Sequence, residues 1–140
     1  MNHPSHLRPI PLWRIALAVV ARAQPLASAL AASPAELATA YAARSGVPPR
    51  PDSGQQFFTA NHGREWSCST CHGALPTQPG RHAATGKPIG ALAPAFDPQR
   101  FSNGDKIEKW FRRNCRDVVG RECTAGEKAD VIAWLMTLKP

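Results

Sequence analysis

Hydrophobic residues recur at helical spacing in three separate stretches of this chain of 140 residues. The first predicted helix starts after Ser33, which can cap it in a capping box with Glu36, and ends at Gly46. Leu37 and Tyr41 lie four residues apart on one face of this helix. Two later helices carry longer apolar stripes, at spacings of three and four residues in one, and of three, four and seven in the other. The stripes consist of Ile107, Trp110 and Phe111 in one helix, and of Val131, Trp134, Leu135 and Leu138 in the other.

Helix-start signals precede both of the later stripes. The segments Ser102–Asp105 and Thr124–Glu127 each have the composition of a capping box, with a small hydroxyl residue three positions before a carboxylate. A further short helix is expected at Gly54–Phe58, where it presents two aromatic side chains. We expect the last helix to pack across this short helix and to close the domain.

Two stretches are predicted to lie outside the helices. The Pro-rich segment 47–51 favours an extended linker. Residues 73–100 contain five prolines and four glycines in 28 positions, with no sustained period, which indicates a long functional loop. The sequence therefore predicts an all-α domain of three to five short helices with one long Pro/Gly-rich loop.

The first 31 residues have the layout of a secretory signal peptide, which leaves residues 32–140 as the single domain. Arg8 and Arg14 precede a short apolar run at 15–21, and small residues follow at 27–31, although Arg22 interrupts the apolar region. An amphipathic or disordered tail is the alternative interpretation. Export would deliver the domain to the periplasm, where disulfides can form.

The formal net charge is +7, but three of the 17 basic residues and none of the 10 acidic ones fall in the predicted leader. The remaining domain carries 14 basic and 10 acidic residues, a net charge of +4. This mild excess favours an acidic redox partner and gives no indication of a nucleic-acid partner.

The segment Cys68-Ser69-Thr70-Cys71-His72 is typical of covalent haem attachment. In this pattern the two thiols form thioethers to the porphyrin, and the histidine that follows binds the iron as the proximal ligand. A zinc site or a redox dithiol is the alternative. Seven residues separate Cys115 from Cys123, which does not suit a zinc knuckle, and no strand pattern surrounds the motif as thioredoxin requires.

The sixth iron ligand is left open by the residues themselves. Met1 belongs to the leader, and Met136 lies inside the last predicted helix, where it more naturally fills core space. His82 in the long loop is the conventional alternative, and Asn114 is the unconventional one because it ends the apolar stripe that starts at Ile107. In the same loop, Lys87 and Arg81 are competing candidates for contact with a haem propionate.

From Ser33 to Leu138 the chain resembles the small monohaem class I cytochromes c related to sphaeroides haem protein. The shared motifs comprise Trp66-Ser67-Cys68-x-x-Cys71-His72, Thr85-Gly86-Lys87-x-Ile89-x-x-Leu92-Ala93-Pro94, Glu108-Lys109-Trp110-x-x-Arg113-Asn114-Cys115, Gly120-Arg121-x-Cys123-Thr124, and Glu127-Lys128-Ala129-Asp130. They make Trp66, Lys87, Ile89, Leu92 and Trp110 candidates for the haem pocket.

The resemblance implies roles for three further residues and for partners. Asn114 would be the distal ligand of the oxidised haem and would leave the iron on reduction, and Cys115 would form a disulfide with Cys123. A dihaem cytochrome c or a membrane b-type cytochrome would be the electron donor.

Coordination chemistry agrees with such a role for an amide. The amide oxygen is a hard, weak ligand that suits Fe(III) better than Fe(II), so reduction is expected to open a position for O2, CO or NO. The sequence thus predicts one haem c in a periplasmic carrier able to bind gases. The alternatives are an enzyme that consumes the gas, by nitric oxide dioxygenation or oxygen reduction, and a gas or redox sensor.

Overall fold

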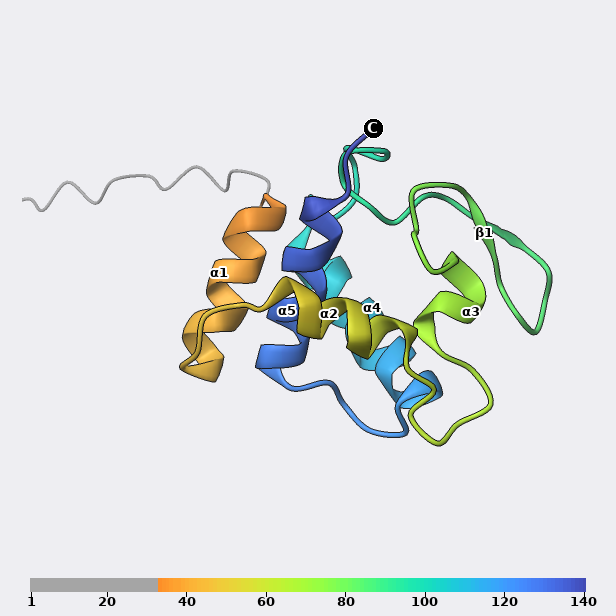
Figure 1. Ribbon diagram of the computed structural model, residues 1–140, viewed down its shortest axis with the longest axis horizontal. Coiled ribbons are helices and arrows are strands. Elements are labelled where there is room, and N and C mark those ends of the chain that lie inside the picture. The colour runs from red at the N-terminus through yellow and green to blue at the C-terminus, as the bar shows by residue number, and fades with distance from the viewer. Residues whose placement is uncertain (1–32) are drawn as a thin grey trace, which may run out of the picture.

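A computed structural model describes residues 33–140, in which five helices and a two-stranded ladder follow one another (Figure 1). The helices are α1 (Pro34–Ser45), α2 (Pro51–Thr59), α3 (Cys68–His72), α4 (Gly104–Val118) and α5 (Ala125–Thr137), and the strands are β1 (Gly80–Arg81) and β2 (Pro88–Ile89). This architecture confirms the predicted all-α class. Within residues 33–140, no helix has the length and apolarity required to cross a membrane. The predicted leader at 1–31 lies outside the described residues.

Helix α5 is the centre of the core, with α1 and α2 packed against it (Figure 1). The predicted stripe is confirmed for Val131, Trp134 and Leu135, which are all buried. Leu138 caps the end of α5 and is only partly buried against the core. Ile132 is also fully buried, so the apolar face of this helix is wider than its stripe indicated. The predicted crossing with α2 is present, since the rings of Phe58 and Trp134 lie 5.0 Å apart between their centroids.

The contact between α2 and α5 is close because Gly54 has no side chain. A Cβ atom at Gly54 would overlap the backbone carbonyl of Asp130. The Asp130 side chain accepts a hydrogen bond of 2.7 Å from the Arg50 backbone N–H at the start of α2. This helix begins at Pro51, so the prediction that Pro51 belongs to the extended linker is wrong. The fixed φ of proline suits the first helical position, where its missing N–H costs nothing.

The predicted capping boxes are correct at two of three helix starts. Ser33 and Thr124 both exchange hydrogen bonds with the glutamate three residues later. At α4 the predicted box of Ser102 with Asp105 is wrong, because Asn103 is the N-cap and its side chain accepts a 2.8 Å hydrogen bond from the Lys106 N–H. Asparagine is among the strongest N-cap residues, so it starts the helix one position later.

The long loop at 73–100 is confirmed as non-helical, and it contains the short ladder that the sequence did not indicate. Gly80 pairs with Ile89 and Arg81 with Pro88 in antiparallel register. The turn between the strands depends on Gly86, whose φ of +65° is readily adopted only by glycine. Two residues per strand are too few for an alternating pattern to be visible in the sequence.

Candidate haem site

The first part of the site is α3, a helix of five residues that is stabilised by its own caps. The Ser67 side chain accepts a hydrogen bond from the Thr70 N–H at 3.2 Å, and the Ser67 N–H donates to the Thr70 hydroxyl at 3.0 Å. Ser67 is 7% exposed, so this box forms inside the protein. It fixes Cys68, Cys71 and His72 on one short helical segment, which is the arrangement that haem attachment requires.

Both thiols of this segment are free and half-buried. Burial raises the pKa of the Cys68 thiol to about 11, so that it stays protonated at neutral pH. A redox dithiol of the thioredoxin type needs a lowered thiol pKa, and this site has the opposite. Zinc is also disfavoured, because residues 33–140 contain no cluster of three His, Cys, Asp or Glu side chains that could hold a metal ion.

His72 has the protonation state that an iron ligand needs. Its ring is half-buried and lies 6.1 Å from the Phe58 ring between centroids. Burial, and secondarily the nearby positive charge of Arg100, lower the pKa of His72. The imidazole is therefore neutral at physiological pH, and a neutral imidazole nitrogen can bind a metal.

The long loop packs directly against α3. A Cβ atom at Gly80 would overlap the carbonyl oxygen of Cys71, so only glycine permits this approach. The Ala83 N–H donates a 3.3 Å hydrogen bond to the Cys71 sulfur. His82 lies between these two contacts, beside α3, and its buried Nδ1 atom has no hydrogen-bond partner among the described residues.

Asn114 lies on α4, a different element from the one that carries His72. The helix continues for four residues beyond it, to Val118, although the apolar stripe ends at Asn114. Its side chain is exposed and makes no hydrogen bond to any residue within 33–140. Trp110 lies on the same side of α4 as Asn114 and is 43% exposed. Its spacing predicted a common apolar face with Ile107 and Phe111, but only these two residues pack against the core.

The other predicted pocket residues differ in burial. Trp66, Ile89 and Leu92 are half-buried, and Leu92 packs against the core cluster. Lys87 is exposed. Arg81, its competitor for a propionate, already donates a 3.2 Å hydrogen bond to the carbonyl of Gly86 in the same turn.

The residues around α3 fit a haem in three respects. The donor set is two free thiols with a neutral imidazole. Large apolar side chains are exposed in the segment after α3 and on α4, with Leu75 59% and Trp110 43% exposed, as expected where an apolar macrocycle is to be covered. The Nδ1 atom of His82 is buried without a partner among the described residues. Haem therefore suits this set of residues.

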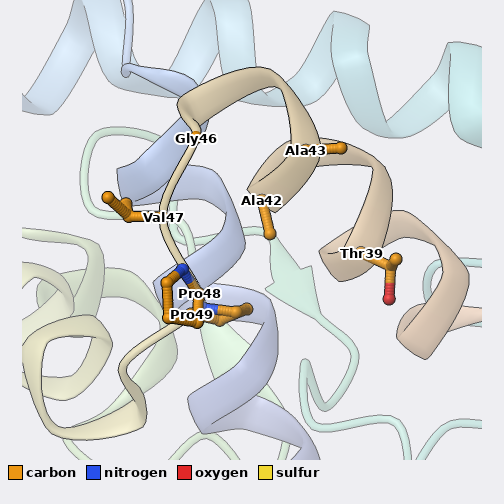
Figure 2. A pocket seen from close by; sticks show the side chains of 7 residues that line it. All are labelled: Thr39, Ala42, Ala43, Gly46, Val47, Pro48 and Pro49. Atoms are coloured by element: carbon orange, nitrogen blue, oxygen red, sulfur yellow. The ribbon is translucent and has the colours of Figure 1, made fainter.

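A separate surface hollow of about 370 Å³ lies between α1 and the linker that follows it (Figure 2). Ala42, Val47 and Pro48 are among its lining residues, and it has no thiol, imidazole or carboxylate. It therefore offers no ligand to a metal ion.

The third and fourth cysteines of the chain form a disulfide that joins α4 to the segment before α5. The Cα atoms of Cys115 and Cys123 lie 5.6 Å apart, and both residues are buried. The bond is adjacent to Asn114, since Cys115 is the next residue.

The roles of Arg100 and Glu108 were not anticipated from the sequence. Arg100 contributes to the lowered pKa of His72 and is held by a hydrogen bond to the Ala91 carbonyl at 2.7 Å and by an ion pair with Asp97 at 3.0 Å. Glu108 joins α4 to α1 and α5. The only sequence signal for Arg100 is its spacing of three residues from Asp97, which is common in turns.

Comparison with known proteins identifies the family. A domain model described as "Domain of unknown function (DUF1924)" matches residues 45–135. The cytochrome c-type protein SHP of Cereibacter sphaeroides is 46% identical over an alignment of 107 residues, which covers 74% of this chain and 82% of that protein. The chain belongs to the SHP family of c-type cytochromes. Its cofactor is one haem c, and both the suspected family and the predicted cofactor are confirmed.

Solved structures agree with this SHP-family assignment. Oxidised SHP, described as an oxygen-binding cytochrome c, matches with a TM-score of 0.72 and 44% identity, over 76% of this chain and 97% of that one. The solution structure of cytochrome c'' from Methylophilus methylotrophus, described with reference to haem-ligand detachment, matches with a TM-score of 0.67 and 33% identity, over 76% and 94% of the two chains. The predicted class of fold is thereby confirmed.

Proposed function

We propose that this SHP-family cytochrome is an electron carrier whose ferrous form binds O2, CO or NO. Cys68 and Cys71 attach the haem, His72 is the proximal iron ligand, and Asn114 is the distal ligand of the ferric state. When bound, the haem supplies a one-electron Fe(III)/Fe(II) couple and, at an open coordination position, a site for a diatomic gas. The description of SHP as oxygen-binding supports the gas-binding part of the proposal.

The observation that carries the proposal is the contrast between Asn114 and Met136. The Asn114 amide is exposed and has no hydrogen-bond partner within residues 33–140, so it is available to a ligand on that side of α4. Met136, the only methionine outside the predicted leader, packs against the core cluster. The thioether that ordinary electron-carrying cytochromes use is thus occupied elsewhere.

The chemistry of the amide explains how Asn114 would act. Its oxygen is a hard and weak donor, so Asn114 binds the ferric iron and releases the ferrous iron. After release, its NH2 group stays nearby and can donate a hydrogen bond to a bound gas.

A carbon monoxide titration of the reduced protein tests this proposal. We expect a high-spin ferrous spectrum that converts to a CO adduct, with the same affinity in a Met136→Leu variant. A low-spin, six-coordinate ferrous form that does not bind CO would contradict the proposal.

We further propose a periplasmic location and an acidic electron donor, for which the resemblance suggests a dihaem cytochrome c or a membrane b-type cytochrome. Charge supports an acidic partner, because α4 exposes four basic side chains that have no ion pair among the described residues. These are Lys106, Lys109, Arg112 and Arg113. A row of like charges steers an oppositely charged protein toward the helix that carries Asn114.

A further inference from the structure

Three helices meet at the carboxylate of Glu108 on α4. Its Oε2 atom accepts a hydrogen bond of 2.6 Å from the Tyr41 hydroxyl on α1. Its Oε1 atom accepts one of 2.7 Å from the Lys128 ammonium on α5. Tyr41 is 2% exposed and the Lys128 side chain 8% exposed, so both donors come from inside the core.

Lys128 has little freedom to release this carboxylate. Its ammonium lies 5.3 Å from the centroid of the Tyr41 ring and 5.8 Å from that of Phe111. Glu108 is the one acidic residue paired with it in the described chain. A buried ammonium is costly unless it is paired, so breaking the pair would leave an uncompensated charge.

The ionisation states of these groups fix which atoms donate. Hydrogen bonding from Lys128, and then from Tyr41, holds the pKa of Glu108 below its usual range. Burial, together with Glu108, raises the pKa of Tyr41. At neutral pH the carboxylate is therefore ionised and the phenol is protonated, so both hydrogen bonds persist.

Glu108 and Cys115 hold the same side of α4 at two points. They are seven residues apart, about two helical turns, and each links α4 to a neighbouring segment. Asn114 lies between these two positions in the sequence, next to Cys115, with its side chain exposed. Because the helix is fixed at both positions, the Asn114 amide can move only by rotation about its own side-chain torsions.

We propose that Glu108 is a positioning residue for Asn114. Its carboxylate fixes α4 at the distance from which the Asn114 amide reaches the ferric iron. This inference depends on the proposed ligation by Asn114. Loss of the Glu108 carboxylate would let α4 shift, weaken the ferric bond and favour the ferrous state. The midpoint potential would rise, because Asn114 stabilises Fe(III) more than Fe(II).

The test compares Glu108→Gln with Glu122→Gln in the haem-loaded protein. Glu122 is a matched control, because its carboxylate also pairs with α4, at 2.7 Å from Arg116, but both side chains are more than half exposed. For Glu108→Gln we expect imidazole to bind the ferric protein about tenfold faster, which corresponds to weakening the bond between the Asn114 amide and the iron by about 1.4 kcal/mol. We also expect the midpoint potential to rise. The control should match the wild type in both measurements.

Tyr41→Phe is a milder change that keeps the ring and removes one hydrogen bond to Glu108. This variant tests the positioning role of Glu108 if Glu108→Gln does not fold. We expect a smaller acceleration in the same direction. Unchanged imidazole rates and potentials in these variants, with only a lower unfolding temperature, would overturn the positioning role. Asn114→Ala separates the two proposals: an unchanged imidazole rate there would reject the ligation itself.

Discussion

At the scale of single residues, two glutamates make the folded protein sensitive to acid. Arg121 forms two hydrogen bonds to Glu127, of 2.6 and 2.8 Å, and holds its pKa below the usual range. Lys128 has the same effect on the pKa of Glu108. In both cases the folded state binds the proton less readily than the unfolded state does.

The sign of the pH dependence follows from these lowered values. The stabilisation is fully present above the unfolded pKa of about 4.3, and it is lost as the pH falls through the lower folded values. We expect the urea midpoint to be nearly constant from pH 7 to about 5 and then to decrease. Glu127→Gln should flatten the acid limb, and an equally steep limb in that variant would show that the Arg121 pair is not responsible.

Individual residues were predictable where the pattern is local. Cys68, Cys71 and His72 are adjacent in the sequence, and Ser33 and Thr124 cap helices through residues three positions away. Glu108 was not predictable, because its partners are 67 and 20 residues away and only packing brings them together. Gly54 and Gly80 are similar, since each is required by a backbone atom from a distant segment.

At the scale of elements, α4 is the helix whose attachment matters most. Its disulfide with Cys123 closes a short loop, and a chain-entropy estimate gives it about 2 to 3 kcal/mol of stabilisation. The spacing of apolar residues predicted this helix but not its C-terminal turn, since the charged residues after Cys115 continue it without an apolar signal. The start of α2 and the cap of α4 were assigned wrongly for a different reason, because Pro51 and Asn103 suit the first positions of a helix.

Removal of the disulfide tests whether this bond does more than stabilise the fold. We expect a Cys115→Ser/Cys123→Ser variant to lose about 2 to 3 kcal/mol in urea unfolding. If the disulfide also keeps α4 in place while Asn114 moves, CO should bind the ferrous form of this variant at a rate different from that of the wild type. Wild-type rates in the variant would limit the disulfide to stability.

At the scale of the whole molecule, the proposed proximal and distal iron ligands come from separate parts of the fold. His72 belongs to α3 and the adjoining loop, whereas Asn114 belongs to α4, which the core helices hold from the other side. The proximal half is fixed by a local sequence pattern. The proposed distal half depends on the position of a complete helix.

The most direct test of this account is the ferric spectrum, measured by optical absorption and electron paramagnetic resonance in three proteins. The wild type, Asn114→Ala and His82→Ala would be compared at neutral pH. We predict that Asn114→Ala changes the ferric spin state and that His82→Ala leaves it as in the wild type. A ferric spectrum that changes in His82→Ala and not in Asn114→Ala would contradict the central claim that Asn114 is the distal ligand.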